Sequence, residues 1–169
     1  MKPFPSSKIH LFFWVLILAA NSFFLCLAIL APLLRPGNPD LAASIYATFA
    51  PFCHQLPARC FWLRSHPLPL CGRCLGILSG FFLGTILYPL IKSLRSTCFP
   101  SARWLVFFSL PIALDTLGNL TSLWNTPTWP RFGLGLSWGI ILPFYFFPAV
   151  ARSWPDTAID ASSASWKKE

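Results

Sequence analysis

The sequence has very few charged residues for its length. Asp, Glu, Lys and Arg together make up 11% of its 169 residues, and only five residues are acidic. Soluble domains carry roughly a quarter charged residues, so this chain has too little polar surface to stay dispersed in water. The scarcity of charge therefore excludes a soluble globular domain.

The basic residues do not gather into a binding surface. There are 13 Lys and Arg residues, and the formal net charge is +8, a balance that is also found in nucleic-acid-binding proteins. A nucleic-acid interface needs a basic patch or stripe, whereas these residues are scattered between apolar runs. Basic residues that flank membrane-spanning segments explain the pattern. We therefore predict that the protein is embedded in a lipid bilayer and does not bind nucleic acid.

Apolar and aromatic residues are abundant instead. Hydrophobic residues make up 55% of the chain, with 8 Trp and 17 Phe. A helix needs about 20 apolar residues to cross the bilayer core, and four segments approach this length. The predicted spans are residues 9–34, 70–91, 104–124 and 132–150. We predict an all-α integral membrane protein, a bundle of four transmembrane helices forming a single domain over residues 1–152, with a polar, mobile tail over residues 153–169.

The loops between these spans set the topology. The first loop, residues 35–69, contains a half-apolar stretch over residues 41–52 that indicates a short helix in the membrane interface. With four spans, the first and third loops must lie on the same side. Eight Lys and Arg residues fall in the termini and second loop, against five in the first and third loops. Basic residues favour the cytoplasmic side, so we predict a multi-pass protein of the cell membrane with both termini in the cytoplasm.

A cluster of potential metal ligands lies in and just after the first loop. It consists of Cys53, His54, Cys60, His66, Cys71 and Cys74. A Cys-x-x-Cys pair supplies two thiolates, and a second Cys or His pair completes a tetrahedral zinc site. We predict such a site from Cys53, His54, Cys71 and Cys74. Because adjacent residues seldom both reach one ion, Cys60 or His66 is a possible substitute for one of the first two.

The same Cys-x-x-Cys spacing is typical of redox-active dithiols. Cys71 and Cys74 stand at the start of the second predicted span, where the helix dipole stabilises a thiolate. A thiol–quinone oxidoreductase that forms disulfides is therefore an alternative function, with a quinone as its cofactor. Enzymes of that group use a second working pair of cysteines, and the third loop here has none. Metal binding and redox chemistry both remain open.

The second predicted span carries Gly76, Gly80 and Gly84 at intervals of four residues. Small residues at this spacing let another helix approach closely within a bilayer. The pattern predicts a packed interface, either with another helix of the chain or with a second copy in a homo-oligomer.

One carboxylate, Asp115, lies near the middle of the third predicted span. A charge at this depth costs about 2.5–3.5 kcal/mol on insertion scales, which makes it a candidate for a functional site. Asn119 follows one helical turn later on the same face, and Arg73 and Arg131 stand at the loop ends of neighbouring spans. We predict that Asp115 and Asn119 line a polar pocket beneath a cap formed by residues 53–74, with Arg73 or Arg131 between them.

These four residues are candidate catalytic residues, and two roles are open for Asp115. Either it serves chemistry or ion transport in the pocket, as in a small transporter-like subunit, or it forms a structural ion pair with an arginine. The pocket would suit a small ligand, an ion or a quinone head. Asp115 has no acidic partner, so a hydrolase with paired carboxylates is excluded.

The motifs resemble those of the domain of unknown function 2085 family, small predicted membrane proteins of bacteria and archaea. The first matching block consists of Cys53, His54, Gln55, Pro57, Arg59, Phe61, Pro69, Cys71, Arg73, Cys74 and Gly76. The second consists of Asp115, Asn119, Asn125, Thr126, Arg131, Gly133 and Gly135. The resemblance spans residues 52–139 and implies an architecture and a set of residues, but no activity. Cys60 replaces a Ser of the family pattern, and Asn119 replaces a Gln.

Overall fold

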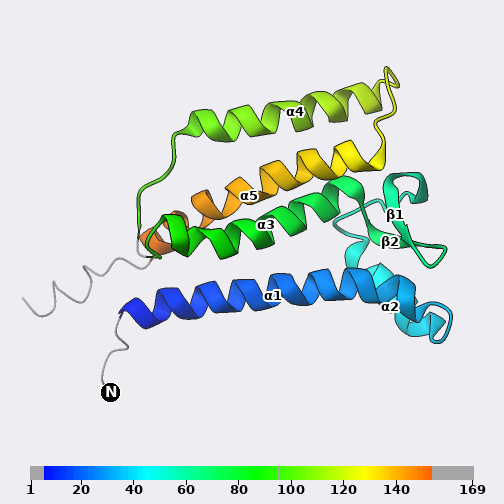
Figure 1. The fold of residues 1–169 in the computed structure, drawn as a ribbon, viewed down its shortest axis with the longest axis horizontal. Coiled ribbons are helices and arrows are strands. Elements are labelled where there is room, and N and C mark those ends of the chain that lie inside the picture. Colours follow the sequence, from blue (N-terminus) through cyan, green and yellow to red (C-terminus); the bar gives the residue numbers. More distant parts are fainter. Residues whose placement is uncertain (1–5, 95, 154–169) are drawn as a thin grey trace, which may run out of the picture.

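The structure is a computed structural model that describes residues 6–94 and 96–153. Its elements are α1 (Ser6–Leu34), α2 (Pro39–Phe49), the 3-10 turn η1 (Pro57–Arg59), β1 (Cys60–Leu63), β2 (His66–Cys71), α3 (Gly72–Ile91), α4 (Ala102–Leu120) and α5 (Thr128–Ser153). The four long helices run alongside one another, while α2 and the small sheet gather at one end (Figure 1). The predicted tail beyond Ser153 lies outside the described residues.

Three helices are long and apolar enough to cross a membrane. They contain the candidate spans His10–Leu34, Gly72–Ile91 and Thr128–Arg152, which correspond to the first, second and fourth predicted spans. The 19-residue helix α4 is not among the candidates found in the described part of the chain. The structure is thus a mostly helical membrane protein with three candidate membrane-spanning helices.

The long helices alternate in direction along the chain. In Figure 1 α1 and α4 run towards the end that carries the sheet, and α3 and α5 run away from it. The connection from α1 to α3 and the turn from α4 to α5 therefore meet at this end, which we call the cap end. A cavity lined by Arg59 on one side and Asn125 on the other confirms that the two connections are neighbours.

The purely α-helical prediction missed an antiparallel hairpin in the first loop. Strand β1 pairs with β2, and Leu63 faces His66 across a two-residue turn. Arg64 and Ser65 occupy this turn with φ values of 49° and 64°, the left-handed backbone that two-residue hairpins require. Gly or Asn usually supplies that conformation, and β2 also contains two prolines, which weaken a strand signal. The sequence therefore gave no clear hairpin pattern.

Helix α2 fixes the hairpin against the bundle. Its start is set by Asn38, whose side chain accepts a hydrogen bond from the backbone N–H of Leu41 at 3.3 Å, an N-cap contact. Ile45 and Phe49 are buried in a core that includes residues of α1 and β2. The Tyr46 hydroxyl donates a hydrogen bond to the backbone carbonyl of Pro67 in β2. These contacts hold the end of α2, and hence Cys53, next to the start of α3.

The glycine face of α3 packs against α5. Gly76, Gly80 and Gly84 are all buried, and a Cβ atom built on Gly76 would lie 2.2 Å from the backbone oxygen of Phe132. Gly139 of α5 has the same relation to α3, since its Cβ would lie 2.3 Å from the oxygen of Ile77. The helix partner of the glycines is α5 of the same chain, and a second copy cannot contact this face while α5 occupies it.

Candidate functional site

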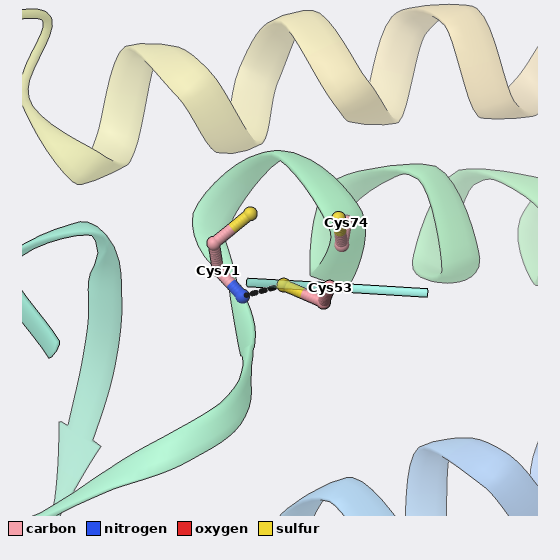
Figure 2. Close-up of side chains that lie close together, drawn as sticks. All are labelled: Cys53, Cys71 and Cys74. Carbon is pink, nitrogen blue, oxygen red and sulfur yellow. Dashed lines mark hydrogen bonds between the residues drawn. The ribbon is translucent and has the colours of Figure 1, made fainter. Parts of the chain in front are cut away.

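Three cysteine side chains meet at the cap end. Cys53 follows α2, Cys71 ends β2 and Cys74 lies in the first turn of α3. Their Sγ atoms all lie within 4.8 Å of one another, and Figure 2 shows Cys53 and Cys71 on either side of the strand-to-helix junction, with Cys74 one turn along. All three are free thiols. We call these three residues the thiol cluster.

Hydrogen bonds within the thiol cluster favour the ionised form of the Cys53 and Cys71 thiols. The backbone N–H of Cys71 donates a hydrogen bond to Sγ of Cys53 at 3.2 Å. Hydrogen bonds from the thiols of Cys53 and then Cys74 hold the pKa of the Cys71 thiol well below its usual value. Since the thiolate is both the metal ligand and the nucleophile, Cys71 is prepared for either chemistry.

The geometry of the thiol cluster fits a soft metal ion. Zinc binds thiolate sulfur at about 2.3 Å, which places tetrahedral sulfur ligands about 3.8 Å apart. Sγ atoms that all lie within 4.8 Å of one another are compatible with shared binding of one ion. Thiolates select zinc, copper(I) or iron–sulfur clusters over hard ions such as magnesium. In the described part of the chain no fourth Cys, His, Asp or Glu joins this group.

The other predicted ligands lie apart from the thiol cluster. His54 is exposed, and His66 lies at the turn end of β2. Cys60 is buried and its Sγ donates to the backbone oxygen of Leu56 at 3.2 Å. Burial, followed by the charges of Cys53 and Cys71, raises the pKa of the Cys60 thiol to about 12. Cys60 is not part of the group of three cysteines whose sulfur atoms converge.

A cavity of about 380 Å³ opens beside the thiol cluster. Besides the three cysteines, its polar lining comes from His54, Gln55, Arg59, Thr116 and Asn119. The cavity thus joins the first loop to one face of α4. This volume lies within the range of ligand-binding pockets, so a small molecule in the cavity would contact the sulfur atoms directly.

Beneath this cavity an ion pair joins α3 to α4. Nη2 of Arg73 contacts Oδ2 of Asp115, and both side chains are largely shielded from solvent. Nη1 of Arg73 donates to the Thr116 hydroxyl at 2.8 Å. Arg73 lies between Cys71 and Cys74 in sequence, and its partner Thr116 also lines the cavity beside the thiol cluster.

Asn119 connects this ion pair to the start of α5. Its amide donates to Oδ1 of Asp115 at 3.0 Å, and its Oδ1 accepts from the backbone N–H of Thr126 at 3.2 Å. The Thr126 hydroxyl also donates to Oδ1 of Asp115. Arg131, buried at 3% exposure, donates to the side-chain oxygens of Asn119 and Asn125. The structure thus brings all four candidate catalytic residues into one network.

Two threonines of this network were not among the predicted site residues. Thr126 stands next to Asn125 in the second motif block, and its place in that block was a signal that could have identified it. Thr116 follows Asp115 directly, and no motif marks it. Its hydroxyl also donates to the backbone oxygen of Ile112 at 2.7 Å, so it links Arg73 to the α4 backbone.

Comparisons with known proteins place these motifs among predicted membrane proteins. The model of the family described as "Predicted membrane protein (DUF2085)" matches residues 53–145. An uncharacterised protein of Methanocaldococcus jannaschii is 33% identical over 108 residues, which cover 64% of this chain and 69% of that protein. An uncharacterised protein of Methanothermobacter thermautotrophicus is 33% identical over 94 residues, covering 54% of this chain and 81% of that protein. No solved structure matches.

Proposed function

This chain belongs to the DUF2085 family of predicted membrane proteins, and from that premise we propose that its thiol cluster binds one zinc-like ion above a polar intramembrane pocket. The observation that carries the proposal is the convergence of three Sγ atoms from three different segments within 4.8 Å. The backbone N–H donated to Sγ of Cys53 supports a thiolate ligand at that position.

Three protein ligands leave one coordination position for water or a ligand. Structural zinc sites generally have four protein ligands, whereas catalytic sites have three and keep the fourth position open. The cavity beside the thiol cluster gives that position access to His54, Arg59 and Asn119. When bound, the ion would supply Lewis acidity towards an oxygen-containing ligand. The polar side chains of the cavity would orient that ligand.

Cysteine substitutions test this proposal. Purified wild-type protein is expected to carry about one zinc-like ion per chain by elemental analysis. Replacing Cys53, Cys71 or Cys74 with Ser removes a soft ligand and is expected to abolish retention of the ion. Cys98→Ser is the matched control, because Cys98 is exposed and outside the thiol cluster. Equal metal content in Cys71→Ser and Cys98→Ser would refute the assignment.

We include a four-span topology in the proposal. Although α4 is not among the candidate membrane spans of the described residues, it presents an outward row of large apolar side chains. Those exposed by more than half are Trp104, Val106, Phe107, Leu110, Leu114, Leu117 and Leu120. Contact with lipid tails would stabilise this face, whereas water would not. The alternating direction of the long helices (Figure 1) fits four crossings as well.

Reporter fusions test the topology. Fusions in the connection between α3 and α4 and after α5 are both expected to report the cytoplasm, because basic residues favour that side. A fusion in the turn between α4 and α5 is expected to report the opposite side. If the fusions before α4 and after α5 report opposite sides, the four-span count is wrong.

A thiol–quinone oxidoreductase is the second candidate function. Cys74 lines both the polar cavity and a separate apolar groove of about 430 Å³ between α1, α2 and α3. Asn21, the groove's polar residue, has a buried Oδ1 without a hydrogen-bond partner among the described residues. A quinol hydroxyl could donate to it.

In the thiol–quinone reaction Cys71 and Cys74 would form a disulfide and pass two electrons and two protons to a quinone, giving the quinol. With cytoplasmic termini the thiols face outside, where disulfides persist. Metal-free protein with oxidised Cys71 and Cys74 would favour this candidate.

A further inference from the structure

The cap end contains more positive than negative charge. Arg59 from η1, Arg73 from α3 and Arg131 from α5 all lie around the Asp115 network. Arg73 is neutralised by Asp115. Arg131 donates hydrogen bonds to the uncharged side-chain oxygens of Asn119 and Asn125, and the nearby charge of Asp115 attracts it as well. Three guanidinium groups thus surround one carboxylate, which leaves an excess of two positive charges among these described residues.

The proposed metal site does not remove this imbalance. Three thiolates and one divalent ion carry a net charge of −1, so one positive charge still has no counterpart. Arg131 is only 3% exposed, and a buried charge is costly unless it is paired. Arg59 and Arg73 also repel Arg131, since all three guanidinium groups are near one another. The site is therefore short of an anion.

Unused hydrogen-bond donors accompany the excess charge. Nε of Arg131 and Nε of Arg73 are buried and have no acceptor among the described residues. The side chain of Arg59 makes no hydrogen bond or ion pair within residues 6–94 and 96–153, yet it lines two cavities. These are the 380 Å³ cavity beside the thiol cluster and a second of about 550 Å³ that reaches Ser122 and Asn125. Arg59 and Asn119 belong to both.

We propose that these adjoining cavities bind a small oxyanion, a carboxylate or a phosphate group, through the guanidinium group of Arg59. Arginine suits this role because its planar fork donates two parallel hydrogen bonds to such a group. The side-chain NH2 of Asn125, whose oxygen alone is bonded to Arg131, would orient the ligand, and the charge of Arg131 behind it would attract it. The inference deepens the proposed function, because it names a ligand class for the pocket beside the metal site.

The test uses purified, delipidated full-length protein in detergent. Three probes are titrated separately by calorimetry: inorganic phosphate, succinate and micellar phosphatidic acid. Arg59→Gln removes the charge but breaks no side-chain hydrogen bond or ion pair within the described residues, so it is expected to fold normally. We expect at least about tenfold weaker binding than in the wild type, from the loss of a charge-assisted hydrogen bond. Arg64→Gln is the control, since Arg64 is exposed in the same hairpin and lines neither cavity.

The outcomes separate the possible sources of the anion. Arg59-dependent binding of phosphate or succinate indicates a soluble ligand, and Arg59-dependent binding of phosphatidic acid alone indicates a lipid headgroup. If no probe distinguishes Arg59→Gln from Arg64→Gln, the inference is wrong. Should Arg59→Gln fail to fold, Arg59→Lys keeps the charge without the planar fork. It is then expected to weaken binding several-fold, and unchanged affinity would overturn the proposal.

Metal analysis of the same samples keeps this inference distinct from the proposed function. Arg59→Gln is expected to retain its metal, because Arg59 is not part of the thiol cluster. Arg59-dependent anion binding in metal-free protein would overturn the metal assignment alone. Bound metal without Arg59-dependent anion binding would overturn the anion site alone.

Discussion

Replacing Gly80 with Ala is expected to separate α3 from α5 and to destabilise the protein by about 3 kcal/mol, the upper end for overpacking. A Cβ atom at this position would lie 2.3 Å from the backbone oxygen of Leu136 and 2.9 Å from the backbone nitrogen of Ile140. Backbone atoms cannot rotate away, so the helices must move apart. Thermal unfolding in detergent measures the effect.

Gly133 supplies the control for this substitution. It also lies in α5, but a Cβ built there has nothing within 4 Å. Gly133→Ala is expected to be neutral or slightly stabilising, because Ala is a better helix former than Gly. Equal melting temperatures for Gly80→Ala and Gly133→Ala would show that close helix packing is not what the glycines provide.

Asp115→Asn is expected to lower the yield of folded protein. The substitution leaves Arg73 as an unpaired and largely buried cation, and breaking a buried ion pair in this way costs about 3–5 kcal/mol. The extensive bonding of the carboxylate to Arg73, Asn119 and Thr126 favours the structural role over a transported ion or proton. Monodisperse protein after gel filtration, together with its melting temperature, measures the loss.

A second substitution separates pairing from other roles of Asp115. The double variant Asp115→Asn with Arg73→Gln removes both charges, so it is expected to recover much of the lost stability. Full stability of the single Asp115→Asn variant would contradict a structural ion pair. Combined with a loss of function, that result would support the catalytic or transport role instead.

Much of the architecture follows from patterns that repeat along the chain. Long apolar runs predicted α1, α3 and α5, because crossing a bilayer imposes a minimum length. Gly76, Gly80 and Gly84 predicted a close helix contact but did not identify the partner. The partner helix is α5, which contributes Gly135 and Gly139 to the contact. It could not be identified from the sequence, because the register between the two helices is set by three-dimensional packing.

The candidate site was only partly predictable. The Cys-x-x-Cys motif identified Cys71 and Cys74 because their spacing is local, whereas the approach of Cys53 depends on the packing of α2 against α1 and β2. The sequence could not show that His54 is exposed, since adjacent residues point in different directions once the backbone is fixed. The sequence likewise could not show whether Arg73 or Arg131 is the ion-pair partner of Asp115, because this depends on how α3 and α4 are rotated relative to each other.

X-ray absorption at the zinc edge of the purified protein tests the metal assignment most directly. We expect three sulfur scatterers at about 2.3 Å and one oxygen or nitrogen ligand at about 2.0–2.2 Å. Three sulfur ligands would match Cys53, Cys71 and Cys74, with the lighter ligand in the open position. A metal-free protein with a Cys71–Cys74 disulfide, or a bound ion with fewer than three sulfur ligands, would show that the thiol cluster is not a three-cysteine metal site.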